Sequence, residues 1–73
     1  MINNPADVDF SDIVSWLHDF GFVLERIAGS HHIFRHPVQK AKLNFQPERS
    51  GKAKAYQVKQ AIRLIASLDL RSR

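Results

Sequence analysis

The chain has 73 residues, of which 44% are hydrophobic and none is cysteine. A chain of this length folds as one domain, because it buries only about 60% of its unfolded surface and cannot build two cores or a deep substrate cavity. Without cysteine it forms neither a disulfide nor a thiolate metal cage, which is typical of the reducing cytoplasm. Neither a signal peptide nor an apolar run long enough to span a membrane is recognisable, so we expect a cytoplasmic protein without membrane contact.

The charges are unevenly distributed along the chain. Residues 1–25 contain five acidic residues and no Lys or Arg, whereas residues 26–73 contain all eleven basic residues and only two acids. The net charge of +4 therefore conceals a strongly basic later part. This distribution favours a surface that binds a polyanion. A solvated basic surface that only keeps the protein soluble is an equally simple interpretation.

The ends of the chain are predicted to lie outside the folded unit. Residues 1–8 are polar and show no periodicity, so we expect a flexible lead-in. The single domain is then predicted to span residues 9–70, and residues 71–73 form a short C-terminal tail.

The first predicted element is a helix. Apolar residues recur at helical spacing from Phe10 to Phe20, and Gly21 follows as a typical residue after a helix C-terminus. Asp9 and Asp12 resemble a weak capping box at the start of this helix.

Three strands are predicted next. Residues 22–28 are rich in large apolar and β-branched residues and lead into a turn at Gly29-Ser30. Residues 31–36 form the returning strand, and residues 42–46 alternate between apolar and polar side chains as a third strand. A proline follows each of the last two strands, and proline cannot donate to a sheet.

The last predicted element is a second helix. It follows a polar loop at residues 47–54, begins near Tyr56 and presents an apolar stripe that includes Val58, Ile62 and Ile65. A three-stranded antiparallel sheet with both helices on one face buries the two apolar stripes most simply. The expected fold class is therefore α+β, in the order α-β-β-β-α of a double-stranded-RNA-binding domain.

Three of the four histidines lie within residues 31–36. On an extended strand, His32 and His36 share a face but lie about 13 Å apart, too far for one ion to bind both. His31 points to the opposite face, so we predict no metal site. If Phe34 anchors the core, His32 and His36 flank it; if Ile33 does, His31 lies on the covered face. The sequence leaves this choice open.

His31 is the first candidate for chemistry, because it follows a hairpin turn where a side chain is both accessible and held in place. Histidine is suited to proton transfer near neutral pH, and the 2′-hydroxyl of RNA attacks the adjacent phosphate once it is deprotonated. Four basic residues could hold that phosphate: Lys52, Lys54, Lys59 and Arg63. Alternatively, His31 is an ordinary surface histidine and these bases are a solvated face.

The run from Leu24 to Pro37, LERIAGSHHIFRHP, closely resembles the signature of the HicA-type mRNA interferase toxins. Three later segments are similar to the third strand, the loop and the start of the last helix in one subgroup of that family: Asn44-Phe45-Gln46, Gly51-Lys52-Ala53-Lys54 and Tyr56-Gln57-Val58-Lys59-Gln60. Together these segments cover nearly all of the chain from Phe10 to Leu68.

The resemblance implies a double-stranded-RNA-binding-domain-like fold that acts on translated, single-stranded mRNA without a metal or other cofactor. It also implies inhibition by a HicB-type antitoxin, with a homodimer and a toxin–antitoxin hetero-oligomer both open. The family's catalytic histidine matches His31, and His32 is the second choice. Gly29 matches the turn glycine, and with Ser30 it shapes the turn and is expected to contact RNA.

The sequence departs from the family pattern at two places. Many relatives carry a valine-proline-x-histidine stretch at the end of the third strand, where this chain has Asn44-Phe45-Gln46-Pro47, and Ala55 stands where proline is expected. Two other functions therefore stay open. One is an RNA-binding module without catalysis, and the other is a basic domain that docks an acidic protein.

Overall fold

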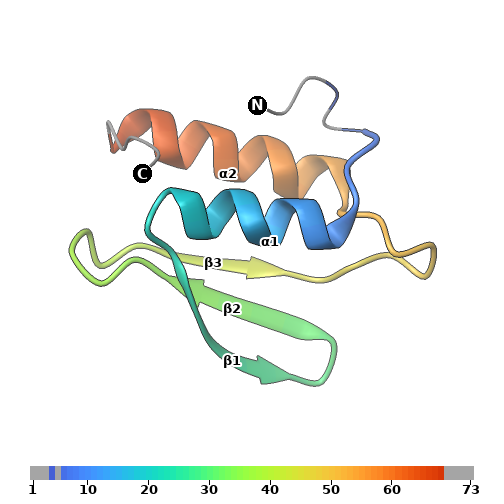
Figure 1. The fold of residues 1–73 in the computed structure, drawn as a ribbon, viewed down its shortest axis with the longest axis horizontal. Helices are drawn as coiled ribbons and strands as arrows, with labels where there is room; N and C mark the ends of the chain where they lie inside the picture. The colour runs from blue at the N-terminus through green and yellow to red at the C-terminus, as the bar shows by residue number, and fades with distance from the viewer. Residues whose placement is uncertain (1–3, 5, 69–73) are drawn as a thin grey trace.

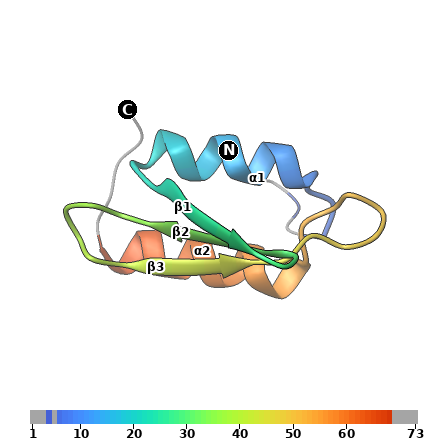
Figure 2. The same cartoon turned by 90° about the horizontal axis from the view of Figure 1, so that it is seen from below.

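The structure, a computed structural model, describes Asn4 and residues 6–68. It contains five elements: α1 (Phe10–Asp19), β1 (Val23–Ala28), β2 (His31–Arg35), β3 (Lys42–Phe45) and α2 (Ala55–Ser67). The strands form an antiparallel sheet in the order β1-β2-β3, and both helices lie on one side of it (Figures 1 and 2). The predicted element order and fold class are confirmed. Neither helix in the described part of the chain is long and apolar enough to cross a membrane.

The two helices run in the same direction, and both begin at the end of the molecule where β1 turns into β2 (Figures 1 and 2). β1 lies farther from the helices than the other strands in Figure 1, and all six of its residues are exposed. α2 is tied to the sheet by Gln57, whose buried side-chain oxygen accepts the backbone N–H of Gln46 at 3.1 Å.

α1 ends at Asp19, and Gly21 follows its C-terminus as the sequence predicts. This glycine has a φ of +94°, the N–H of Gly21 donates to the carbonyl of His18, and the N–H of Phe22 donates to that of Leu17. These two hydrogen bonds form a Schellman motif, which turns the chain sharply into β1. At the start of α1, Asp9 is the N-cap residue, but its side chain makes no capping hydrogen bond, which differs from the predicted capping box.

The core lies between the sheet and the helices, and its largest fully buried side chains are Phe22, Phe45, Ile13, Leu17 and Val58. Phe34 is 2% exposed and packs edge-to-face on Phe45, with ring centroids 6.2 Å apart. Phe34 is therefore the core anchor of β2. Because side chains alternate along a strand, Ile33 lies on the other face, which no helix covers and which we call the open face.

The sequence alone would predict a regular strand for β1, but the strand is irregular. Leu24 pairs with Phe34, and Arg26 pairs with Ile33, so the register shifts by one residue between them. This shift is a β-bulge. Strict alternation would place Arg26 on the helix side, whereas the bulge turns it to the open face beside Glu25.

The segment before α1 pairs with the loop before α2. The N–H of Ala53 donates to the carbonyl of Val8 at 2.8 Å, and the N–H of Phe10 donates to that of Gly51 at 2.9 Å. Val8 is buried and belongs to the core. Of the predicted lead-in, residues 1–3 and 5 lie outside the described residues, as does the predicted tail at 71–73.

Candidate active site

His31 begins β2 directly after the Gly29-Ser30 turn and is exposed on the open face. The turn needs glycine, since Gly29 has a φ of +62°, which glycine adopts without strain. The ring Nδ1 of His31 lies 3.1 Å from the side-chain oxygen of Asn44. An amide oxygen only accepts hydrogen bonds, so in the neutral ring this contact favours the tautomer with the proton at Nδ1 and the lone pair at Nε2.

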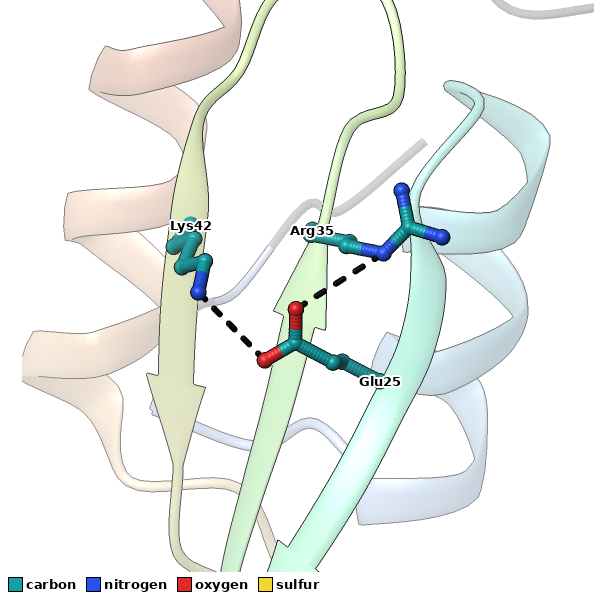
Figure 3. Close-up of polar contacts among 3 residues, drawn as sticks. All are labelled: Glu25, Arg35 and Lys42. Carbon is teal, nitrogen blue, oxygen red and sulfur yellow. Dashed lines mark hydrogen bonds and ion pairs between the residues drawn. The ribbon is translucent and has the colours of Figure 1, made fainter.

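Glu25 holds two cations on the same open face (Figure 3). Its carboxylate lies 3.7 Å from Nε of Arg35 and 3.4 Å from Nζ of Lys42, which come from β2 and β3. The two cationic side chains are 45% and 63% exposed. Exposed ion pairs of this kind are weak, so both cations can exchange Glu25 for a phosphate group.

The open-face cations lie at two distances from His31. Arg26 is the diagonal neighbour of His31 across the β1–β2 pair, because His31 pairs with Ala28 and Ile33 with Arg26. Diagonal Cα atoms are about 7–8 Å apart, within reach of an arginine side chain. Arg35 lies four residues along β2, about 13 Å away. A polyanion lying along β2 could therefore contact His31, Arg26 and Arg35 together.

The other two histidines of this segment face the helices. Nδ1 of His32 lies 3.2 Å from the carbonyl oxygen of Ser30, and its ring packs edge-on against Phe10 at 4.8 Å. His36 is buried, packs against Phe22, and accepts two backbone N–H groups of the following turn at Nδ1. His36 therefore has a structural role, and His32 lies on the opposite side of the sheet from His31.

Lys52, one of the predicted phosphate contacts, is engaged by two carboxylates. Its Nζ lies 2.8 Å from Asp9 and 2.9 Å from Asp7. The hydrogen bonds to Asp9 and Asp7 raise the pKa of Lys52, and the hydrogen bond from Lys52 lowers the pKa of Asp7 below its ordinary value of 3.8. A phosphate at Lys52 would compete with both carboxylates.

The other three predicted bases are on α2 or at its start. Lys54 is the N-cap residue of α2, at the same end of the molecule as the turn before His31 (Figure 1). Lys59 and Arg63 are exposed farther along α2. Because α2 covers the opposite side of the sheet, the structure does not bring these two bases together with His31.

Two residues beside His31, Asn44 and Arg26, are not among the site residues predicted from the sequence. Asn44 belongs to the polar face of the predicted third strand. The pairing of Ile33 with Asn44, which the sequence does not specify, places this face next to His31. For Arg26, the available signal is the spacing of Leu24 and Ile27. These apolar residues stand three positions apart rather than two, as expected around a bulge.

The fold and the site define a class of protein: a small basic α+β domain with an exposed imidazole beside cations on an open sheet face. Among the residues that the structure describes, no three His, Asp or Glu side chains gather as a metal site requires.

A family model described as the HicA toxin of bacterial toxin–antitoxin systems matches residues 10–66. The chain belongs to this family, which confirms the resemblance seen in the sequence. Membership makes it a toxin of a toxin–antitoxin system and implies an antitoxin as its partner. No curated protein and no solved structure gives a significant match.

Proposed function

We propose that this toxin is an mRNA interferase, a cytoplasmic endoribonuclease that cleaves single-stranded mRNA without a metal or other cofactor and is inhibited by a HicB-type antitoxin. The observation that carries the proposal is His31, exposed on the open face with Nδ1 3.1 Å from the side-chain oxygen of Asn44 and no hydrogen-bond partner at Nε2 among the described residues. Family membership supports the toxin role. The element order, which a double-stranded-RNA-binding domain shares, supports RNA as the target.

The reaction follows from the free Nε2 of His31. This atom accepts the proton of a ribose 2′-hydroxyl while the oxygen attacks the adjacent phosphorus. The bond from phosphorus to the 5′ oxygen breaks, and that oxygen takes a proton from water. The products are a 2′,3′-cyclic phosphate and a 5′-hydroxyl, and the imidazolium returns its proton to solvent. Arg26 is placed to offset the negative charge that develops on the phosphate.

The remaining contacts to RNA divide into two groups. Arg35 and Lys42 would hold a neighbouring phosphate on the open face, and the Gly29-Ser30 turn would border the RNA at His31. The bases predicted from the sequence would serve RNA that continues around the end of the molecule: Lys52, Lys54, Lys59 and Arg63. His32 remains the second choice for proton transfer.

The test is to incubate a defined single-stranded RNA with the purified protein in the presence of a chelator and to analyse the ends of any fragments. We expect cleavage with cyclic or 3′ phosphates, and a loss of about 10²- to 10⁴-fold in His31→Ala, as for removal of a general base. His18→Ala is the matched control, because His18 is an exposed histidine of α1. Circular dichroism should show an unchanged fold in both variants.

Two results would overturn the proposal. Intact RNA in a salt-dependent complex would indicate an RNA-binding module without catalysis. Absence of both cleavage and RNA binding at low salt would indicate a basic domain that docks an acidic protein. Cleavage that persists in His31→Ala would move the catalytic role to another residue, of which His32 is the first to examine.

A further inference from the structure

We infer that Asn44 is a positioning residue for His31, because it fixes the tautomer that leaves Nε2 free to accept a proton. The effect on the tautomer follows from the 3.1 Å contact between Nδ1 of His31 and the side-chain oxygen of Asn44. The effect on catalysis rests on the proposed function.

The tautomer decides whether His31 can act as a base toward the open face. A neutral imidazole carries one proton, and the hydrogen bond made by one ring nitrogen sets which nitrogen holds it. With Asn44 accepting from Nδ1, the lone pair is at Nε2, on the far side of the ring. Without this acceptor, molecules with the proton at Nε2 would also be populated, and these have no lone pair to offer there. The hydrogen bond also fixes the rotation of the ring.

Both partners of this hydrogen bond stand on firmly held backbone. Asn44 lies between Leu43 and Phe45, which are 6% and 1% exposed in the core. His31 is paired with Ala28 at the last rung of the β1–β2 ladder. Because strands hold side chains more rigidly than loops do, the contact can keep a functional ring in one orientation.

The contact contributes little to folding, because both side chains are exposed and water can replace either partner. If the contact were incidental, replacing Asn44 would therefore leave the fold, the tautomer of His31 and the reaction unaffected. A positioning role predicts that the tautomer and the reaction change while the fold does not.

The experiment measures the tautomer directly, without relying on activity. Long-range ¹H–¹⁵N correlation spectra of ¹⁵N-labelled protein, recorded at a pH where His31 is neutral, distinguish a protonated Nδ1 from a protonated Nε2. We expect Nδ1 to carry the proton in the wild type and in Asn44→Asp, which keeps an acceptor. We expect Nε2 to gain it in Asn44→Leu. Gln60→Leu, an exposed position of α2, is the matched control.

Cleavage assays complete the test. Asn44→Leu should lower kcat/KM by about 10- to 100-fold, as does removal of a group that orients a metal-binding histidine, without weakening RNA binding. In Asn44→Asp the negative charge favours the imidazolium, so the acidic limb of the pH–rate profile should move to higher pH.

The outcomes separate the two proposals. An unchanged tautomer or an unchanged rate in Asn44→Leu, in a protein whose cleavage depends on His31, would overturn the positioning role and leave the proposed function standing. A tautomer that changes as expected in a protein that cleaves no RNA would support the assignment of the hydrogen bond and overturn the proposed function.

Discussion

One buried imidazole explains why a glycine follows the C-terminus of α1. A Cβ atom added at Gly21 would lie 2.8 Å from Nε2 of His36, closer than real Cβ contacts allow. The ring cannot easily move away, because its Nδ1 accepts the backbone N–H groups of Val38 and Gln39 at 3.3 and 3.1 Å. Gly21 is therefore required twice, once for its positive φ and once for the space that His36 fills.

Gly21→Ala should destabilise the protein more than Gly51→Ala does. Gly51 also has a positive φ, +87°, but a Cβ there would meet nothing within 4 Å. Its replacement isolates the cost of a left-handed conformation, about 1–2 kcal/mol. Urea unfolding of both variants gives the comparison. Equal losses in the free energy of unfolding would show that His36 accommodates the extra methyl group.

At the scale of elements, the bulge in β1 decides which cations share a face with His31. It turns Glu25 and Arg26, which are consecutive, toward the same side of the sheet. Glu25 holds Arg35 and Lys42 (Figure 3). Arg26 pairs with Ile33, next to the site. A one-residue irregularity in an exposed strand thus adds Arg26 to the cations of the open face.

Arg26→Gln should weaken RNA binding and reduce the slope of log affinity against log salt by about 1, as for the loss of one phosphate contact. Lys40→Gln is the control, since it removes the same charge from the loop between β2 and β3 (Figure 1). Titrations with single-stranded RNA at several salt concentrations measure both slopes. If Lys40→Gln lowered the slope as much as Arg26→Gln, RNA would respond to net charge rather than to the open face.

The elements themselves were predictable because their signals are local. Apolar spacing marks the helices, Gly21 follows the end of α1, and the Gly29-Ser30 turn separates two strands in the structure as in the prediction. The site was predictable only in part. His31 stands out beside its turn, but its partner Asn44 is thirteen residues away and becomes a neighbour only through the β2–β3 register. Register depends on pairing between strands, which the local pattern does not specify.

Across the whole molecule, the uneven charge of the sequence becomes a set of internal contacts. Three acids of the first 25 residues bind bases that follow them in the chain: Asp7 and Asp9 bind Lys52, and Glu25 binds Arg35 and Lys42. The contact at Lys52 joins the start of the domain to the loop before α2, where backbone hydrogen bonds of Phe10 and Ala53 also connect the two segments. Acidic residues of the first 25 positions thus form ion pairs that connect the start of the domain and β1 to later segments of the chain.

The contact of Lys52 with Asp7 and Asp9 should make stability depend on pH in a defined way. The pKa of Asp7 is lowered from 3.8, so its contribution is present above that value and is lost as the pH falls through the lowered value. The pKa of Lys52 is raised above 10.5, so its contribution is present below that pH and is lost as the pH rises through the raised value. The contact therefore stabilises the protein between these limits.

Lys52→Met should lower the Tm at neutral pH, because it removes the cation and leaves two carboxylates close together without a partner. The difference from the wild type should shrink as the pH falls through the lowered pKa of Asp7, because protonation then removes the charge that Lys52 binds. Lys59→Met, at an exposed position of α2, controls for the loss of one positive charge and should follow the wild-type profile. Thermal unfolding from acid to neutral pH measures all three proteins. A Tm difference that stayed constant down to about pH 2 would show that Lys52 stabilises the loop through its aliphatic chain rather than through the two carboxylates.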